Sequence, residues 1–189
     1  MREALVATAC LWGALATAHT ADPSALEEAQ RLVGLEYRLG PGAAAGQIIA
    51  QRPSCSNVGG SVVWNDGRPM DEWSFGEFIC NGRSIALLKR QVGEASNGPT
   101  WRIVDALPLP SYEQHGEPKR PNALRLYFNG ECELDGKTDT LFFALVRFGK
   151  RDRIDWRTGV ERAWGFNLTA ERIVPLSTKR IVCYRPEPA

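Results

Sequence analysis

Four cysteines lie well beyond the N-terminus, and their spacing indicates structural disulfides instead of redox or metal chemistry. No two of them form a C-x-x-C motif, the spacing typical of thioredoxin-like redox sites and of many zinc sites. Four cysteines allow three pairings. We favour Cys55–Cys80 and Cys132–Cys183, because each of these bridges closes a loop within one half of the chain.

The chain offers few residues for acid–base or nucleophilic catalysis. His115 is the one histidine expected within the ordered mature chain, because His19 lies at the expected cleavage point of a leader. No G-x-S-x-G motif marks a serine nucleophile. The candidate carboxylate pairs for a hydrolase are Asp71/Glu72 and Asp152/Asp155, which are more simply explained as exposed loop charges. We therefore predict no catalytic residue, metal ligand or cofactor, and favour a protein that is not an enzyme.

Arginine and tryptophan side chains provide the candidate binding surface. The densest basic region runs from 147 to 162, although acidic residues interrupt it. Trp73 lies in the polar stretch MDEWSFGEF, which favours an exposed ring. Aromatic rings beside arginines suit both sugar faces and hot spots of protein interfaces. The predicted surface consists of Trp73, Arg151, Arg153 and Arg157.

The first 18 residues resemble a secretory signal peptide. The stretch from 4 to 18 carries no charge, is too short to span a bilayer, and ends in Ala16-Thr17-Ala18, a small-x-small cleavage pattern. Cys10 lacks the large aliphatic residue that precedes a lipoprotein cysteine by three positions, so we expect it to be removed with the leader. The mature chain then has an even number of cysteines and belongs in an oxidising compartment. We predict the periplasm, with an extracellular location as the alternative.

Composition excludes several classes of partner. Removal of the leader shortens the chain from 189 to 171 residues, a length typical of one domain or two small ones, and leaves the net charge at +1. A nucleic-acid binder normally carries a clear basic excess, so we expect no nucleic-acid partner. No long apolar run remains after the leader, and we expect no stable membrane insertion after cleavage.

Local patterns predict one helix followed by many strands. Ser24 and Glu27 form a capping box, and Leu26, Ala29 and Val33 recur at helical spacing as a core-facing stripe. Asn-Gly between apolar segments is the strongest short hairpin signal, and it occurs at Asn81-Gly82. The nearly continuous apolar run from 141 to 148 predicts a central strand buried on both faces.

These elements predict an α+β fold that is mainly antiparallel β with an N-terminal helix and two disulfide-stapled lobes. The predicted organisation is a signal peptide at 1–18, an N-terminal lobe at 19–107, a proline-rich connection at 108–121 and a C-terminal lobe at 122–189. Cys55 and Cys80 belong to the first lobe, and Cys132 and Cys183 belong to the second. The segment from 156 to 168 fits helical and strand spacing, and its two glycines favour a strand.

From about Trp101 onward, the chain resembles a set of small exported proteobacterial proteins without an assigned function. The residues that carry this resemblance are Trp101 to Leu107, Cys132 with Gly136-Lys137, Ala144 to Val146, Ala163-Trp164 with Asn167 and Thr169, and Val182-Cys183. They cover about half of the mature chain. The resemblance implies export, and it implies no chemistry.

Three functional hypotheses follow. The leading one is a non-enzymatic periplasmic binding protein whose partner is another envelope protein, as for an inhibitor or an immunity-type factor. The second is a cell-wall or glycan-binding module that uses tryptophan and arginine. The third is a carboxylate-dependent hydrolase. The leading hypothesis rests on small size, the cysteines and a near-zero net charge.

Overall fold

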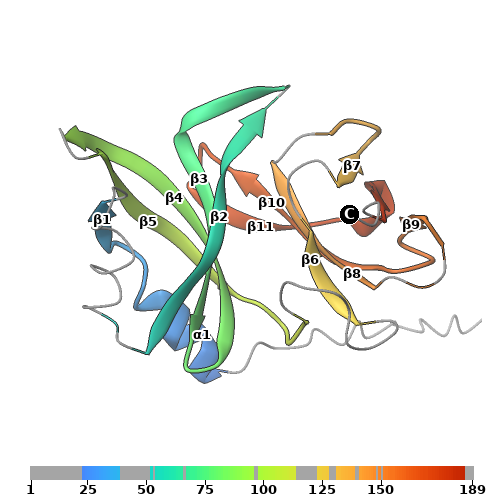
Figure 1. Ribbon diagram of the computed structural model, residues 1–189, viewed down its shortest axis with the longest axis horizontal. Helices are drawn as coiled ribbons and strands as arrows, with labels where there is room; N and C mark the ends of the chain where they lie inside the picture. The colour runs from blue at the N-terminus through green and yellow to red at the C-terminus, as the bar shows by residue number, and fades with distance from the viewer. Residues whose placement is uncertain are drawn as a thin grey trace, which may run out of the picture.

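The computed structural model describes residues 23–38, 52, 54–65, 67–95, 98–113, 123–127, 131–138, 141–147, 149 and 151–185. The predicted leader and His115 lie outside these described residues. The described chain is predominantly antiparallel β with one α-helix, so the mainly β prediction is confirmed and the helical contribution is small (Figure 1). No helix within the described ranges is long and apolar enough to cross a membrane.

A five-stranded antiparallel sheet forms the first half of the structure. It contains β1 (Glu36–Arg38), β2 (Cys55–Asn65), β3 (Arg68–Cys80), β4 (Arg83–Ala95) and β5 (Gly98–Pro108), in the order β1-β5-β4-β3-β2. Asn81 and Gly82, with φ values of 50° and 77°, connect β3 to β4. Positive φ at both turn residues is what an Asn-Gly hairpin turn requires, so this predicted hairpin is confirmed.

Two smaller sheets form the second half. The four-stranded sheet contains β6 (Leu124–Tyr127), β8 (Phe142–Arg147), β10 (Val160–Asn167) and β11 (Arg172–Leu176), in the order β11-β10-β8-β6. The predicted central strand is β8, which pairs on both sides and is buried from Phe142 to Val146. The three-stranded sheet has the order β7-β12-β9 and consists of β7 (Cys132–Leu134), β9 (Arg153–Asp155) and β12 (Ile181–Tyr184), with the short 3-10 helix η1 (Thr178–Arg180) leading into β12.

The helix α1 (Pro23–Gln30) packs against the first sheet with a different face from the one predicted. Ala25, Ala29 and Leu32 are buried, whereas Leu26 and Val33 are more than two-fifths exposed. Positions 25, 29 and 32 also follow helical spacing, and two alanines let the helix lie close to the sheet. The predicted stripe was therefore right for Ala29 and wrong for Leu26 and Val33. Both stripes are apolar, and contact with the sheet selects the one with smaller side chains.

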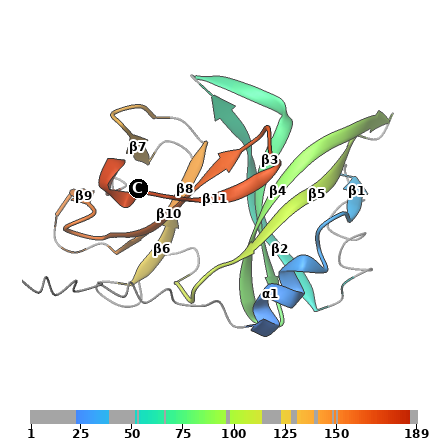
Figure 2. The ribbon, with the colours of Figure 1, turned by 180° about the vertical axis from the view of Figure 1, so that it is seen from behind.

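One aromatic cluster joins the two halves. Phe75 of β3 lies 4.9 Å from Phe143 of β8, measured between ring centroids, and Phe143 lies 5.1 Å from Trp164 of β10. These rings belong to a buried core to which the five-stranded and four-stranded sheets both contribute. The two views show the sheets side by side with β3, β10 and β11 at their junction (Figures 1 and 2). The halves therefore share one core cluster, and each also has a buried cluster of its own.

A half-buried carboxylate on β5 and a buried one on β3 add polar contacts to this region. Asp105 on β5 accepts a hydrogen bond from the backbone N–H of Ile173 on β11 at 2.7 Å, and Arg172 lies 3.4 Å from its other oxygen. Glu77 on β3, which is 2 % exposed, accepts a hydrogen bond from the Tyr112 hydroxyl. Burial, and then this bond to Glu77, raise the pKa of Tyr112. Both contacts use side chains to tie a later segment to the first sheet.

Removing the Asp105 carboxylate is expected to weaken the junction of the two sheets. Asp105→Ala leaves the Ile173 amide without its acceptor, and an unpaired buried group costs about 1–3 kcal/mol. Asp152→Ala is the matched control, because the Asp152 side chain is 94 % exposed and lies 3.6 Å from Arg185, a geometry that contributes little. Urea unfolding measures both losses. Equal losses for the two variants would contradict the proposed role of Asp105.

The two disulfides are those favoured by the sequence. Cys55–Cys80 joins register partners on β2 and β3, and Cys132–Cys183 joins register partners on β7 and β12. All four cysteine side chains are buried. Each bridge therefore fixes the register of one strand pair.

Candidate functional site

The structure separates Trp73 from the arginines with which it was grouped. Trp73 lies on β3, is only 6 % exposed and belongs to the core between the sheets, with the Arg90 guanidinium 5.5 Å from its ring centroid. The prediction of an exposed ring was wrong, because Trp73 and Phe75 alternate along a strand and point to the same buried face. The alternation of Trp73 and Phe75 could have predicted a buried ring, but the polar residues around Trp73 suggested an exposed one.

The three arginines of the predicted surface lie in the C-terminal half and are exposed. Arg153 is the first residue of β9, Arg151 precedes it, and Arg157 lies in the turn that follows. Neither Arg151 nor Arg153 forms an ion pair with another residue that the structure describes. These guanidinium groups therefore remain available on the described surface.

Trp156 is an exposed aromatic residue that the sequence did not lead us to select. Its side chain is 43 % exposed and follows β9 directly. The Arg157 guanidinium carbon lies 4.8 Å from the Trp156 ring centroid, and the Lys179 Nζ, from η1, lies 5.7 Å from it. The one available signal was that Trp156 stands between two charged residues, Asp155 and Arg157, which suits a surface turn.

The turn that presents Trp156 is held by its own side chains. The Asp155 carboxylate accepts hydrogen bonds from the Arg157 amide and the Thr158 hydroxyl, each at 3.0 Å. The Thr158 hydroxyl in turn accepts a bond from the Asp155 amide at 2.8 Å. The bond from Thr158 is the main reason that the pKa of Asp155 is lowered. The Asp155 carboxylate thus has a structural role, because its hydrogen bonds stabilise the turn.

Gly159 lets this turn pack against β8. The Gly159 carbonyl accepts a hydrogen bond from the Arg147 amide at 2.8 Å, and a Cβ at position 159 would overlap the Arg147 carbonyl oxygen. A side chain is therefore excluded by the neighbouring backbone. The result is a turn with little freedom to reorganise when a partner binds.

We call the exposed group on this sheet the Trp156 surface, and it consists of Trp156, Arg157, Lys179, Arg153 and Tyr184. Tyr184 of β12 is 41 % exposed and is the register partner of Arg153. Arg180 is excluded because it pairs with Asp135, whose pKa this hydrogen bond lowers. The Trp156 surface therefore combines two exposed aromatic rings with three cations.

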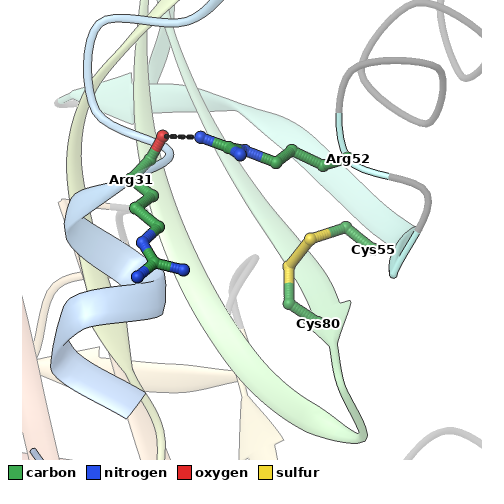
Figure 3. Close-up of a disulfide and its surroundings, with 4 residues drawn as sticks. All are labelled: Arg31, Arg52, Cys55 and Cys80. Atoms are coloured by element: carbon green, nitrogen blue, oxygen red, sulfur yellow. Dashed lines mark hydrogen bonds between the residues drawn. A yellow bond between two sulfur atoms is a disulfide. The ribbon is translucent and has the colours of Figure 1, made fainter. Parts of the chain in front are cut away.

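The described residues contain one group with metal-ligand types, and it is not suited to metal binding. Glu28 lies within 4.8 Å of the sulfurs of Cys55 and Cys80, but these sulfurs are bonded to each other and cannot act as thiolates. Figure 3 shows this disulfide beside the end of α1. Among the carboxylate candidates, Asp71 and Glu72 are exposed on β3.

Comparison of the chain with protein-family models, with curated proteins and with solved structures finds no match. We therefore infer a function for this protein from its own residues.

Proposed function

We propose that this protein is a non-enzymatic exported binding protein that acts in the periplasm after loss of a signal peptide at 1–18. Two disulfides in the described structure support an oxidising compartment. The resemblance of the C-terminal half to small exported proteobacterial proteins supports the same location. We expect its partner to be another envelope protein, as for an inhibitor or an immunity-type factor.

The observation that carries this proposal is the exposed Trp156 ring with Arg157 and Lys179 over it. Tryptophan, tyrosine and arginine are the residues most often found as hot spots of protein interfaces, and the Trp156 surface contains all three. The turn is held in place before binding, so little ordering entropy is lost when a partner docks. The exposed cations favour a partner with an acidic face.

A periplasmic pull-down with the tagged protein tests this function. We expect a stoichiometric protein partner whose affinity falls by about tenfold or more in Trp156→Ala, because removal of a hot spot typically costs about 2 kcal/mol or more. Trp64→Ala is the matched control, since Trp64 is 40 % exposed on β2 of the other sheet. Binding should also weaken as salt concentration rises.

Two results would contradict the proposal. One is the absence of any stoichiometric protein partner when genes adjacent to that of this protein are expressed. The other is equal loss of binding in Trp156→Ala and Trp64→Ala. Sedimentation of the protein with peptidoglycan, abolished in Trp156→Ala, would instead indicate a glycan-binding module.

A further inference from the structure

A lysine interrupts the apolar face of the first sheet that packs against α1. Ile85, Leu87 and Lys89 succeed one another on this face of β4, and Lys89 is only 5 % exposed. The register places Lys89 opposite Ser74 of β3 and Ile103 of β5. Alternation along β4 would place an apolar side chain at this position, and Lys89 places a cation there instead.

Two glycines make room for the Lys89 ammonium group. A Cβ at Gly76 would lie 2.7 Å from the Lys89 Nζ, and a Cβ at Gly60 would lie 3.3 Å from it. Gly60 and Gly76 are register partners on β2 and β3, so the Lys89 side chain lies across both strands. The Tyr37 ring of β1 lies 5.9 Å from the same nitrogen.

Lys89 has no acceptor within the described part of the chain. No hydrogen bond or ion pair joins its Nζ to another described residue, and burial lowers the pKa of Lys89 to about 8. A buried charge is normally paired, because desolvation of an unpaired one is costly. Lys89 is therefore not half of a structural ion pair within the described residues.

Two further buried donors on this face also lack an acceptor among the described residues. They are the indole Nε1 of Trp101 and the Nε of Arg52. Trp101 is the register partner of Tyr37 and lies two positions from Ile103, the partner of Lys89. Arg52 precedes β2 and reaches α1, where its Nη2 donates to the Arg31 carbonyl at 3.2 Å (Figure 3). Buried polar groups are nearly always hydrogen-bonded, so the unpaired indole N–H of Trp101, close to Lys89 in the strand register, calls for an acceptor.

The position of Trp101 gives a ligand a short route to this face. Thr100, the next residue of β5, is half-buried and pairs with Arg38 and Gly93, which are both exposed. Trp101 therefore lies one position inside the exposed end of the sheet, and Lys89 lies further in, opposite Ile103. Since every orphan group is a donor and Lys89 carries a single charge, the complementary ligand is a singly charged acceptor.

We propose that the α1 face of the five-stranded sheet is a second binding site, separate from the Trp156 surface, where Lys89 and Trp101 bind the carboxylate of a small organic acid. The two carboxylate oxygens accept from the Lys89 ammonium and the Trp101 indole N–H. The apolar part of the acid lies beside Tyr37 of β1 and points toward the exposed end of the sheet.

The test is titration of the protein, purified from the periplasm, with sodium benzoate and with sodium decanoate at pH 7. We expect saturable one-to-one binding of at least one of these probes. Preference for benzoate would indicate a compact aromatic acid as the ligand, and preference for decanoate would indicate a fatty acid. Lys89→Met is expected to weaken binding by about tenfold or more, because a charge-assisted hydrogen bond is lost. Trp101→Phe, which keeps an aromatic ring and removes the donor, is expected to weaken it by a smaller factor.

Controls separate this site from the Trp156 surface. Lys179→Met and Trp156→Ala should leave carboxylate binding unchanged, so a failure of the pull-down leaves this test intact. With lysine labelled at Cε, the NMR signal that disappears in Lys89→Met should move on addition of the bound acid. Failure of both acids to saturate at millimolar concentration, or equal affinity of the wild type and a folded Lys89→Met, would overturn the proposal.

Discussion

Lys89→Met is expected to make the protein more stable at pH 7 by about 3 kcal/mol. The Lys89 pKa is about 8 in the folded protein and 10.5 in its ordinary state, and each unit of difference corresponds to about 1.4 kcal/mol. At pH 7 the folded state holds a buried ammonium group without a described acceptor, and methionine fills a similar volume without that penalty. Chemical denaturation measures the gain.

The pH dependence provides the sharper measurement. Between pH 8 and 10.5 the unfolded chain binds more protons at this lysine than the folded protein does, so the folded state gains stability as pH rises. The ring of Tyr37, a titratable side chain, lies 5.9 Å from Lys89 Nζ. Burial raises the pKa of Tyr37, so it stays neutral in this range. From pH 7 to 9.5 the advantage of Lys89→Met over the wild type should shrink by about 2 kcal/mol.

Comparing the two proteins at each pH cancels the groups that they share. A Lys89→Met variant that is less stable than the wild type at pH 7, or an advantage that does not change with pH, would show that Lys89 has an acceptor in solution. Lys137→Met is the control, because Lys137 is exposed and its replacement should change stability little.

Removal of either disulfide is expected to cost several kcal/mol, with different local consequences. The bridges span sequence separations of 25 and 51 residues, for which chain entropy corresponds to about 3.5 and about 4 kcal/mol. A small domain has a net stability of about 5–15 kcal/mol, so either loss is a large fraction of it. Paired Cys→Ser variants and urea unfolding measure both costs.

The Cys132–Cys183 bridge should matter more for the Trp156 surface. It joins β7 and β12, strands of 3 and 4 residues, whereas Cys55–Cys80 joins β2 and β3, strands of 11 and 13 residues that pair along their lengths. Short strands have few other contacts that keep them in register. Partner binding should therefore fall in the Cys132→Ser/Cys183→Ser variant and persist in Cys55→Ser/Cys80→Ser under conditions where both are folded. The opposite order would contradict the assignment of the site to the small sheet.

Much of the architecture follows from local sequence signals. Asn81-Gly82 and Asp135-Gly136 both adopt positive φ at their turns, as short connections between antiparallel strands require. The apolar run in β8 marks the strand that is covered on both faces. The segment from 156 to 168 divides into a turn and β10, in agreement with the strand interpretation. These predictions succeed because turn geometry and strand alternation are set by residues close in the chain.

The candidate sites could be predicted only in part. Arg153 and Arg157 were recognised, but Trp156 was passed over for Trp73. Both tryptophans stand beside charged residues, so local polarity does not distinguish them. Trp73 is buried because its strand face meets the four-stranded sheet, and Trp156 is exposed because it lies in the turn after an edge strand.

The sequence by itself determined the mainly antiparallel character, the hairpin turns and the pairing of cysteines within each half. Tertiary structure alone decided which of two apolar stripes of α1 is buried, which tryptophan is exposed and that Lys89 lies without a described acceptor on an apolar face. The physical reason is the range of the interactions. Turns and strand patterns depend on neighbours in the chain, whereas burial depends on which sheet faces meet, and those faces come from residues far apart in the sequence.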